Sequence, residues 1–216
     1  MNHASLSTAV LACTLALCAG CSGTFTSKAP VSHAYVLRSA TVTGGDHGAA
    51  TPPAFDGTLR IRRPIPAPGF ETDRILLLRD GRELDFYATG HWAAPIPDMI
   101  EALTVESLRR AAYFSAVYGE NSPMRSEYFL QVIVRDFVAE YPGDDTVPVA
   151  RVALECTLGR RLDRTVMATF TAEGQAPAAA NRMNEVVAAY EAALQQALAS
   201  AAASLAAAAK QPPPPG

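Results

Sequence analysis

The sequence predicts one domain of the α/β (α+β) class, with a mainly antiparallel sheet and two main helices packed on one face. Three observations lead to this prediction. Two apolar runs flank the dipeptide Asp80-Gly81, which is a hairpin signal. Three further runs between residues 126 and 170 alternate apolar and polar residues and are separated by turn residues. Two stretches, 95–114 and 177–208, instead repeat apolar residues every three to four positions, as helices do.

The first part of the domain is expected to contain short strands and a proline-rich loop. Tyr35-Val36-Leu37 is a brief apolar run that predicts a first edge strand, and Thr58–Arg62 alternates as a strand does. The stretch 63–69 contains three prolines, which cannot donate hydrogen bonds to a neighbouring strand. This stretch should therefore leave regular structure.

A β-hairpin is predicted from the runs Arg74–Arg79 and Glu83–Thr89. Both central residues of a type I′ turn have positive φ, which an Asp-Gly pair adopts readily. In the second run, Leu84 and Phe86 alternate with two acidic residues. We therefore expect the apolar pair to face the core.

A helix is predicted to begin at Pro95-Ile96-Pro97-Asp98. Prolines suit a first helical turn, and Asp98 places negative charge near the positive end of the helix dipole. The apolar residues of this stretch fall close to one face, namely Ile96, Ile100, Leu103, Ala111 and Phe114.

The longest predicted strand runs from Ser126 to Tyr141. The apolar residues at even positions from 128 to 134 share one side, whereas Phe129, Ile133 and Phe137 share the other side with polar residues. Such a strand is either central and covered on both faces, or its second face meets a partner. The alternating runs 149–158 and 166–170 then complete a meander of three strands.

A long alanine-rich helix is predicted from Pro177 to about Ala208. Its large side chains follow helical spacing on one face, at Met183, Val187, Tyr190, Leu194 and Leu198. Beyond Leu198 the only large apolar residue is Leu205, so we expect the last turns to project from the domain or to pack weakly. A Pro-rich tail, residues 207–216, follows the domain, which spans 35–206.

The N-terminus has the features of an export signal. An apolar run from Leu6 to Leu17 is followed by Leu17-Cys18-Ala19-Gly20-Cys21-Ser22, which resembles the lipobox of bacterial lipoproteins. In those proteins the cysteine is acylated and becomes the first residue of the mature chain. The prediction is a signal peptide over 1–20, lipid attachment at Cys21 and a flexible tether over 21–34. The alternative is an ordinary secretory signal cleaved near Gly20.

Composition and motifs then narrow the function. With the leader removed and Cys21 acylated, Cys156 is the one remaining thiol, and its alternating strand predicts a buried small hydrophobe. The formal net charge of −3 does not imply nucleic acid binding. The histidines lack zinc spacing, and the sequence has neither a GxSxG elbow nor a Gly-rich phosphate loop. We therefore expect a protein that is not an enzyme and that carries no metal or other cofactor.

Several central segments match a known pattern in their order. These are Leu59-Arg60-Ile61, Pro68-Gly69-Phe70-Glu71-Thr72-Asp73-Arg74, His91-Trp92-Ala93 with Pro95, and Val132-Ile133-Val134-Arg135-Asp136-Phe137. Together with the preceding lipobox, they resemble the ABC-type transport auxiliary lipoprotein family. The resemblance extends from about Tyr35 to about Leu198.

That resemblance implies a periplasmic α/β domain anchored by lipid to the outer membrane. It implies as partners an ABC transporter and an MCE-type substrate-binding protein, in a system that moves lipids or other apolar molecules. Ser22, next to the acylated cysteine, is compatible with sorting to the outer membrane. The alternative is a scaffold or assembly lipoprotein of another envelope machine, such as a secretion pore or a cell-wall synthase activator.

Four aromatic residues are the candidates for contact with a partner or an apolar cargo, namely Trp92, Tyr87, Phe129 and Phe137. For Trp92 the competing interpretation is structural, because tryptophan is usually highly buried and could pin the start of the first helix against the sheet. A homo-oligomer is also expected, because the strand Ser126–Tyr141 carries apolar residues on both faces.

Overall fold

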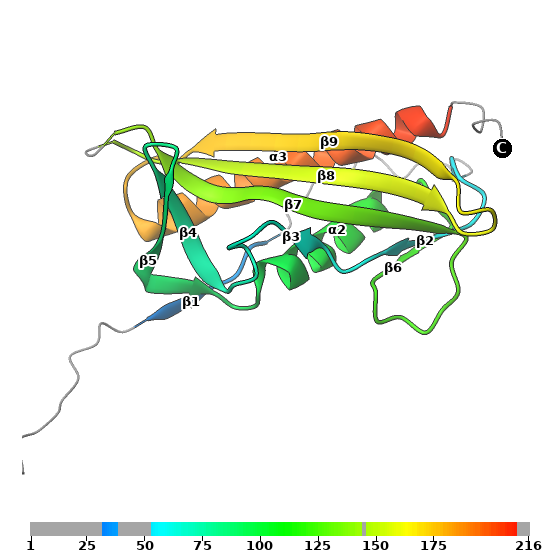
Figure 1. Cartoon of the computed structure of the whole chain (residues 1–216), viewed down its shortest axis with the longest axis horizontal. Helices are drawn as coiled ribbons and strands as arrows, with labels where there is room; N and C mark the ends of the chain where they lie inside the picture. Colours follow the sequence, from blue (N-terminus) through cyan, green and yellow to red (C-terminus); the bar gives the residue numbers. More distant parts are fainter. Residues whose placement is uncertain (1–31, 39–52, 144–145, 211–216) are drawn as a thin grey trace, which may run out of the picture. The chain divides into compact units, whose positions relative to one another are not determined.

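The computed structural model describes residues 32–38, 53–143 and 146–210. These ranges form two helices and a nine-stranded mixed sheet, with more antiparallel than parallel residue pairs, which confirms the predicted fold class (Figure 1). In chain order the elements are β1 (His33–Tyr35), β2 (Thr58–Ile61), β3 (Ile65–Pro66), β4 (Arg74–Arg79), β5 (Glu83–Trp92), α2 (Ile96–Ala111), β6 (Ala116–Tyr118), β7 (Tyr128–Tyr141), β8 (Val149–Arg160), β9 (Val166–Pro177) and α3 (Met183–Ala208).

Strand β7 is the centre of the sheet. Along one edge it pairs antiparallel with β8, which in turn pairs antiparallel with β9, as the predicted meander requires. Along the other edge three short strands follow one another in parallel register, as shown by the pairs Leu59↔Tyr128, Ile65↔Ile133 and Leu77↔Ala139. The prolines between β2 and β4 therefore divide one long edge into separate short strands.

The predicted hairpin is present. Strands β4 and β5 pair antiparallel and are joined by a turn in which Asp80 has φ 49° and Gly81 has φ 64°. Both values lie in the left-handed region that a type I′ turn requires. At the far end of β5, β1 pairs parallel with residues 90–92 and forms the sheet edge. The predicted edge strand thus lies two residues earlier than the run Tyr35-Val36-Leu37.

Helix α2 begins after Pro95 and ends where Ala112 adopts a left-handed conformation with φ 53°. Its last residue, Ala111, lies three residues before Phe114, which the sequence pattern had placed on the helix. The ring of Phe114 instead stacks on Phe55, with centroids 4.5 Å apart. The buried face of α2 includes Ile96, Ile100, Leu103 and Leu108.

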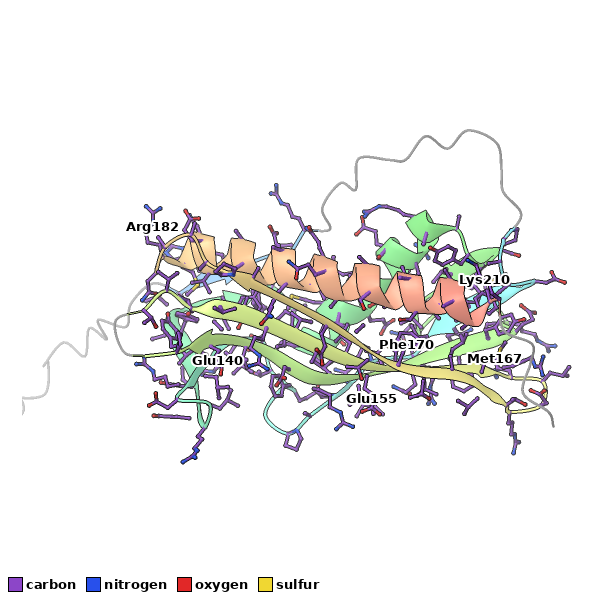
Figure 2. All side chains as sticks on the ribbon, turned by 90° about the horizontal axis from the view of Figure 1, so that it is seen from above. Glu140, Glu155, Met167, Phe170, Arg182 and Lys210 are labelled. Carbon is purple, nitrogen blue, oxygen red and sulfur yellow. The ribbon has the colours of Figure 1, made fainter. Side chains whose placement is uncertain are left out.

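Helix α3 lies along β8 and β9, from Arg182 at one end to Lys210 at the other (Figure 2). Gly174 of β9 allows the close approach, because a Cβ built there would lie 2.0 Å from the carbonyl oxygen of Ala193. The expectation that the last turns project is wrong, since Leu205 is fully buried and Ala201 is also buried. Small alanine side chains let this end of the helix lie close to the domain.

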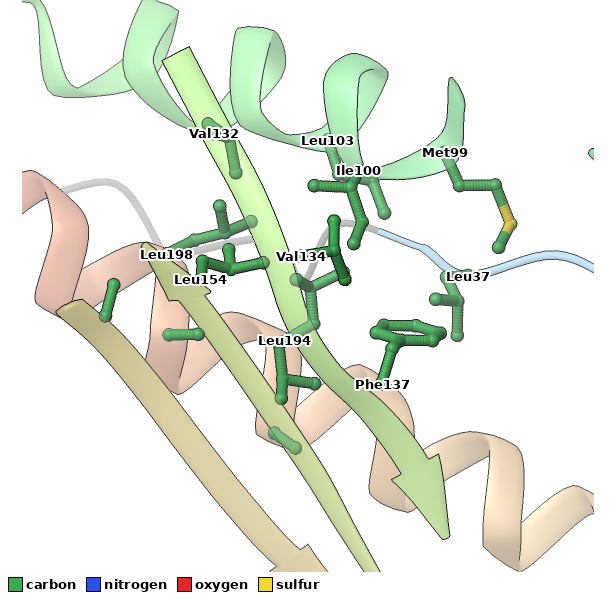
Figure 3. Close-up of a cluster of buried hydrophobic side chains, with 14 of the residues drawn as sticks. Leu37, Met99, Ile100, Leu103, Val132, Val134, Phe137, Leu154, Leu194 and Leu198 are labelled. Carbon is green, nitrogen blue, oxygen red and sulfur yellow. The ribbon is translucent and has the colours of Figure 1, made fainter. Parts of the chain in front are cut away.

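Both helices cover the same face of the sheet. Val132, Val134 and Phe137 of β7 and Leu154 of β8 meet side chains from α2 and α3, and Leu37 lies in the same cluster (Figure 3). Burying a side chain of this size contributes roughly 1.5–3 kcal/mol. We call this side the helix-covered face and the opposite side of the sheet the open face.

Candidate functional site

Within 32–38, 53–143 and 146–210, no three His, Cys, Asp or Glu side chains are grouped closely enough to hold a metal ion. Cys156 is buried on the helix-covered face of β8, and burial raises the pKa of its thiol to about 12. It remains protonated at neutral pH and packs as the predicted small hydrophobe.

The predicted membrane attachment cannot be placed, because Cys21, the signal peptide and most of the tether lie outside the described residues. Neither α2 nor α3, the helices of the described part, combines the length and hydrophobicity needed to cross a bilayer. What the structure does place are the four aromatic residues expected to contact a partner or cargo.

Trp92 is not a contact residue on the surface of this domain. Its side chain is 0% exposed and packs edge-on against Tyr190 of α3, with centroids 5.2 Å apart, and against Phe137, at 5.9 Å. The prediction of a contact role is corrected to the structural alternative. Trp92 joins the end of β5, the central strand and α3 within the core.

Phe137 is also buried, for a reason that the alternation of the strand concealed. The pairing of β7 with β8 shifts register between Val134 and Asp136, so one extra residue is accommodated in β7. After this bulge, each side chain of β7 points to the face opposite to the one that simple alternation predicts. Phe137 therefore points to the helix-covered face with Val134 instead of joining Phe129 on the opposite side, and its predicted contact role is corrected.

Tyr87 is half-buried at the edge of the core. Its hydroxyl lies 2.8 Å from that of Tyr141, and the Tyr141 hydroxyl donates to Oδ1 of Asn181, also at 2.8 Å. Burial, followed by the bond to Tyr141, raises the pKa of Tyr87 well above its usual value. This chain of polar groups holds the β5 end of the sheet to the loop that precedes α3.

Phe129 is the one of the four that lies on the open face. It pairs with Gly159 of β8, and its ring covers this glycine so closely that a Cβ there would lie 2.3 Å from the ring. The ring is half-buried and thus has exposed surface left for a partner. On the other side of β7, Phe129 pairs with Arg60 of β2.

Three residues that the sequence did not indicate as contact residues present larger apolar surfaces on the open face. Leu84 and Phe86 of β5, expected in the core, are 43% and 40% exposed, and Ile65 of β3 is 53% exposed. The guanidinium carbon of Arg74 lies 3.9 Å from the centroid of the Phe86 ring. The sequence could not decide this point. Alternation shows that odd and even side chains of a strand lie on opposite faces, but it does not show which face is covered by the rest of the domain.

A second surface lies between the helices. A cleft of about 240 Å³ separates α2 from α3, with apolar walls formed by Leu103, Ala111, Leu194, Leu198 and Ala202. Arg38 and Glu191 stand at its polar rim, where the Arg38 backbone N–H donates to Glu191 Oε1 at 2.7 Å. The structure thus offers two kinds of binding surface, the open face and this cleft.

Comparison with known proteins identifies the domain as a whole. A family model described as the ABC-type transport auxiliary lipoprotein component matches residues 35–202. The fold is similar to the crystal structure of a protein from Xanthomonas campestris, with 26% identity, a TM-score of 0.70 and coverage of 82% of this chain and 97% of that one. A second crystal structure, of an uncharacterised protein, has 15% identity, a TM-score of 0.55 and coverage of 69% and 90%. No curated protein sequence matches the chain.

Proposed function

Because the chain belongs to the ABC-type transport auxiliary lipoprotein family, we propose that it is a lipid-anchored, non-catalytic adaptor of an ABC transport system. The proposed partners are the ABC transporter and an MCE-type substrate-binding protein. The system would move lipids or other apolar molecules across the envelope, with this chain held at the outer membrane and facing the periplasm.

One observation carries the proposal, namely the extent of the family match. Residues 35–202 begin at the last residue of β1 and end within α3, so they include the central strand, all of α2, most of α3 and both binding surfaces. The match therefore concerns most of the folded unit and not a short motif.

The proposed anchor is the acylated side chain of Cys21. The residues from 22 to 31 separate it from the first described residue, Ser32. A chain of that length spans at most about 35 Å, at roughly 3.5 Å per extended residue. The domain would thus work close to the membrane that holds its lipid.

The contact surfaces of the proposed adaptor are the open face and the cleft between the helices. Exposed apolar side chains on an otherwise charged surface are typical of sites where another molecule binds. On the open face the apolar residues alternate with ion pairs such as Arg135–Glu155 and Arg151–Glu140. This mixture is typical of interfaces that form between separately folded partners.

Co-purification from detergent-solubilised membranes tests the partners. We expect an affinity-tagged full chain to retain the MCE-type subunit and the ABC transporter. A clean single protein under the same conditions would contradict the proposal. Retention of components of a secretion pore or of a cell-wall synthase instead would favour the alternative class of envelope machine.

Metabolic labelling with a fatty acid tests the anchor. The full chain should incorporate label and fractionate with the outer membrane, whereas Cys21→Ser, exported through a replacement leader, should do neither. Cys156→Ala is the matched control, since its thiol is buried and its loss should leave labelling unchanged.

A further inference from the structure

The loop that joins β8 to β9 exposes an apolar side chain in a basic surrounding. The backbone N–H of Arg160 donates to the carbonyl of Thr165 at 2.9 Å and closes the loop, which leaves residues 161–164 at its tip. Leu162 is 93% exposed, more than any other large apolar side chain in the described ranges. Val166, just beyond the loop, is 53% exposed.

The charge of this loop is positive and its shape is fixed. Arg160 forms an ion pair with Asp163 at 2.5 Å, and an oxygen of Asp163 accepts from the backbone N–H of Thr165. The one acidic group of the loop is thereby neutralised. Within the described part of the chain, the side chains of Arg161 and Arg164 have no hydrogen-bond or ion-pair partner.

The positive surface continues onto the adjacent end of the open face. A hollow of about 330 Å³ is lined by Arg60, Arg62, Arg161, Arg164, Glu120 and Phe129. Arg60 is occupied there, because its guanidinium donates to the carbonyls of Glu120 and Ser122. Arg62, Arg161 and Arg164 remain available and outnumber the single carboxylate of Glu120.

We propose that this loop, residues 160–166, is a second membrane contact that binds the surface of an anionic phospholipid bilayer. Leu162 and Val166 enter the boundary between headgroups and acyl chains, while Arg161, Arg164 and Arg62 contact lipid phosphates. A protruding aliphatic residue between arginines is the arrangement by which peripheral proteins bind such surfaces. Protein interfaces are anchored mainly by Trp, Tyr and Arg in desolvated central pockets, whereas the tip, residues 161–164, has no aromatic residue and protrudes.

The loop lies far from where the chain enters the domain. Strands β8 and β9 each have 12 residues, so they extend for about 40 Å. The β1 end of the sheet and the loop lie at opposite ends of these strands (Figure 1). A lipid at Cys21 alone leaves the domain free to pivot about its tether. A second contact at the loop fixes its orientation, whichever transport partner the adaptor serves.

The test uses the Cys21→Ser chain exported through the replacement leader, so that neither the acyl anchor nor the apolar leader remains to bind the vesicles. Its binding to phosphatidylcholine vesicles containing about 30 mol% phosphatidylglycerol, at about 0.1 M salt, is compared with binding to phosphatidylcholine alone. Arg161→Glu/Arg164→Glu should weaken binding at least about 30-fold, and Leu162→Asp at least about tenfold. Arg82→Glu in the β4–β5 turn and Val147→Asp before β8 are the matched controls and should bind as the parent does.

Circular dichroism melting checks that each variant is folded. If Arg161→Glu/Arg164→Glu is unfolded, Arg161→Gln/Arg164→Gln takes its place. Selective binding to the anionic vesicles that depends on the loop supports the proposal. No binding of the parent, equal binding to both vesicles, or equal losses in the loop and control variants would overturn it. A loop that is required for co-purification of the transport proteins but not for vesicle binding would also overturn it, and would leave the adaptor function standing.

Discussion

Gly174 of β9 lies directly against the backbone of Ala193 in α3. An added Cβ would come within 2.0 Å of the Ala193 carbonyl oxygen and within 2.8 Å of the Ala197 nitrogen. A clash with backbone atoms cannot be relieved by a change of rotamer. The absence of a side chain at one position thus sets how closely the long helix lies on the sheet.

Gly174→Ala should therefore destabilise the domain by about 3 kcal/mol, because the helix must move away from β9. Chemical denaturation measures the loss. Gly143→Ala is the matched control, since its added methyl would meet its nearest neighbour at 3.7 Å, an ordinary contact. Equal stability of the two variants would show that the helix is not seated on Gly174.

Phe137→Ala should lower the free energy of unfolding by about 3–5 kcal/mol, as expected for an aromatic ring removed from a packed core. Phe86→Ala, on the open face, should cost about 1 kcal/mol. The fluorescence of Trp92, the only tryptophan, reports both transitions from within the core. A reversed order of the two costs would place Phe137 back on the open side of β7.

Tyr190→Phe should cost about 1–2 kcal/mol, because the Tyr190 hydroxyl donates to the carbonyl of Leu76 at 2.5 Å in the buried core. The pairing of β4 with β7 begins only at Leu77, so the helix supplies the donor at this point. Thermal melting measures the change. Tyr128→Phe, whose hydroxyl has no hydrogen bond among the described residues, should melt close to the parent.

Cys156 should make the domain less stable in alkali. Its pKa is raised by burial to about 12 in the folded state, above the value near 9 of an exposed thiol. The stabilisation from the protonated thiol is complete below pH 9 and is lost as the pH rises from 9 toward 12, because only the unfolded chain ionises. In this window Cys156→Ala should lose stability less steeply than the parent, by up to about 1.4 kcal/mol per pH unit. Parallel pH profiles of the two proteins would contradict a buried thiol.

A homo-oligomer formed through the open face should give a molar mass that is a multiple of the monomer. Phe86→Glu places a charge in such an interface and should lower the mass toward that of one chain, whereas Arg82→Glu in the neighbouring turn should not. Light scattering on the Cys21→Ser chain measures both. A monomer mass that is independent of concentration would exclude self-association through this face.

The parts of the fold that were predictable are those set by neighbours in the sequence. The dipeptide Asp80-Gly81 is sufficient to predict the turn that contains it, and the spacing of apolar residues from Met183 to Leu198 is sufficient to predict a helix there. The bulge after Val134 has no such local signal, because it is defined by pairing with Ala153 on another strand. The face on which Phe137 lies, and hence its role, could not be predicted without that pairing.

The same distinction holds for the candidate surfaces. A turn near Gly159–Asp163 was predictable from composition, but the meeting of its arginines with Arg62 depends on the register of two distant strands. Phe129 could be recognised as an outward residue, whereas its cover over Gly159 could not. The one local hint of the membrane-contact loop was a leucine placed between arginines in a turn.

The pairing of β2, β3 and β4 with one later strand also constrains how the domain acquires its structure. Leu59 and its partner Tyr128 are 128 − 59 = 69 residues apart in the chain. The proposed export from the N-terminus would deliver the three short strands well before the strand that joins them. Until β7 emerges, the edges of these strands that face it are unpaired, and closing such long loops slows folding. The newly exported chain would therefore depend on protection from aggregation during its passage, and a delay in exporting residues 128–141 should be more harmful than one after β9.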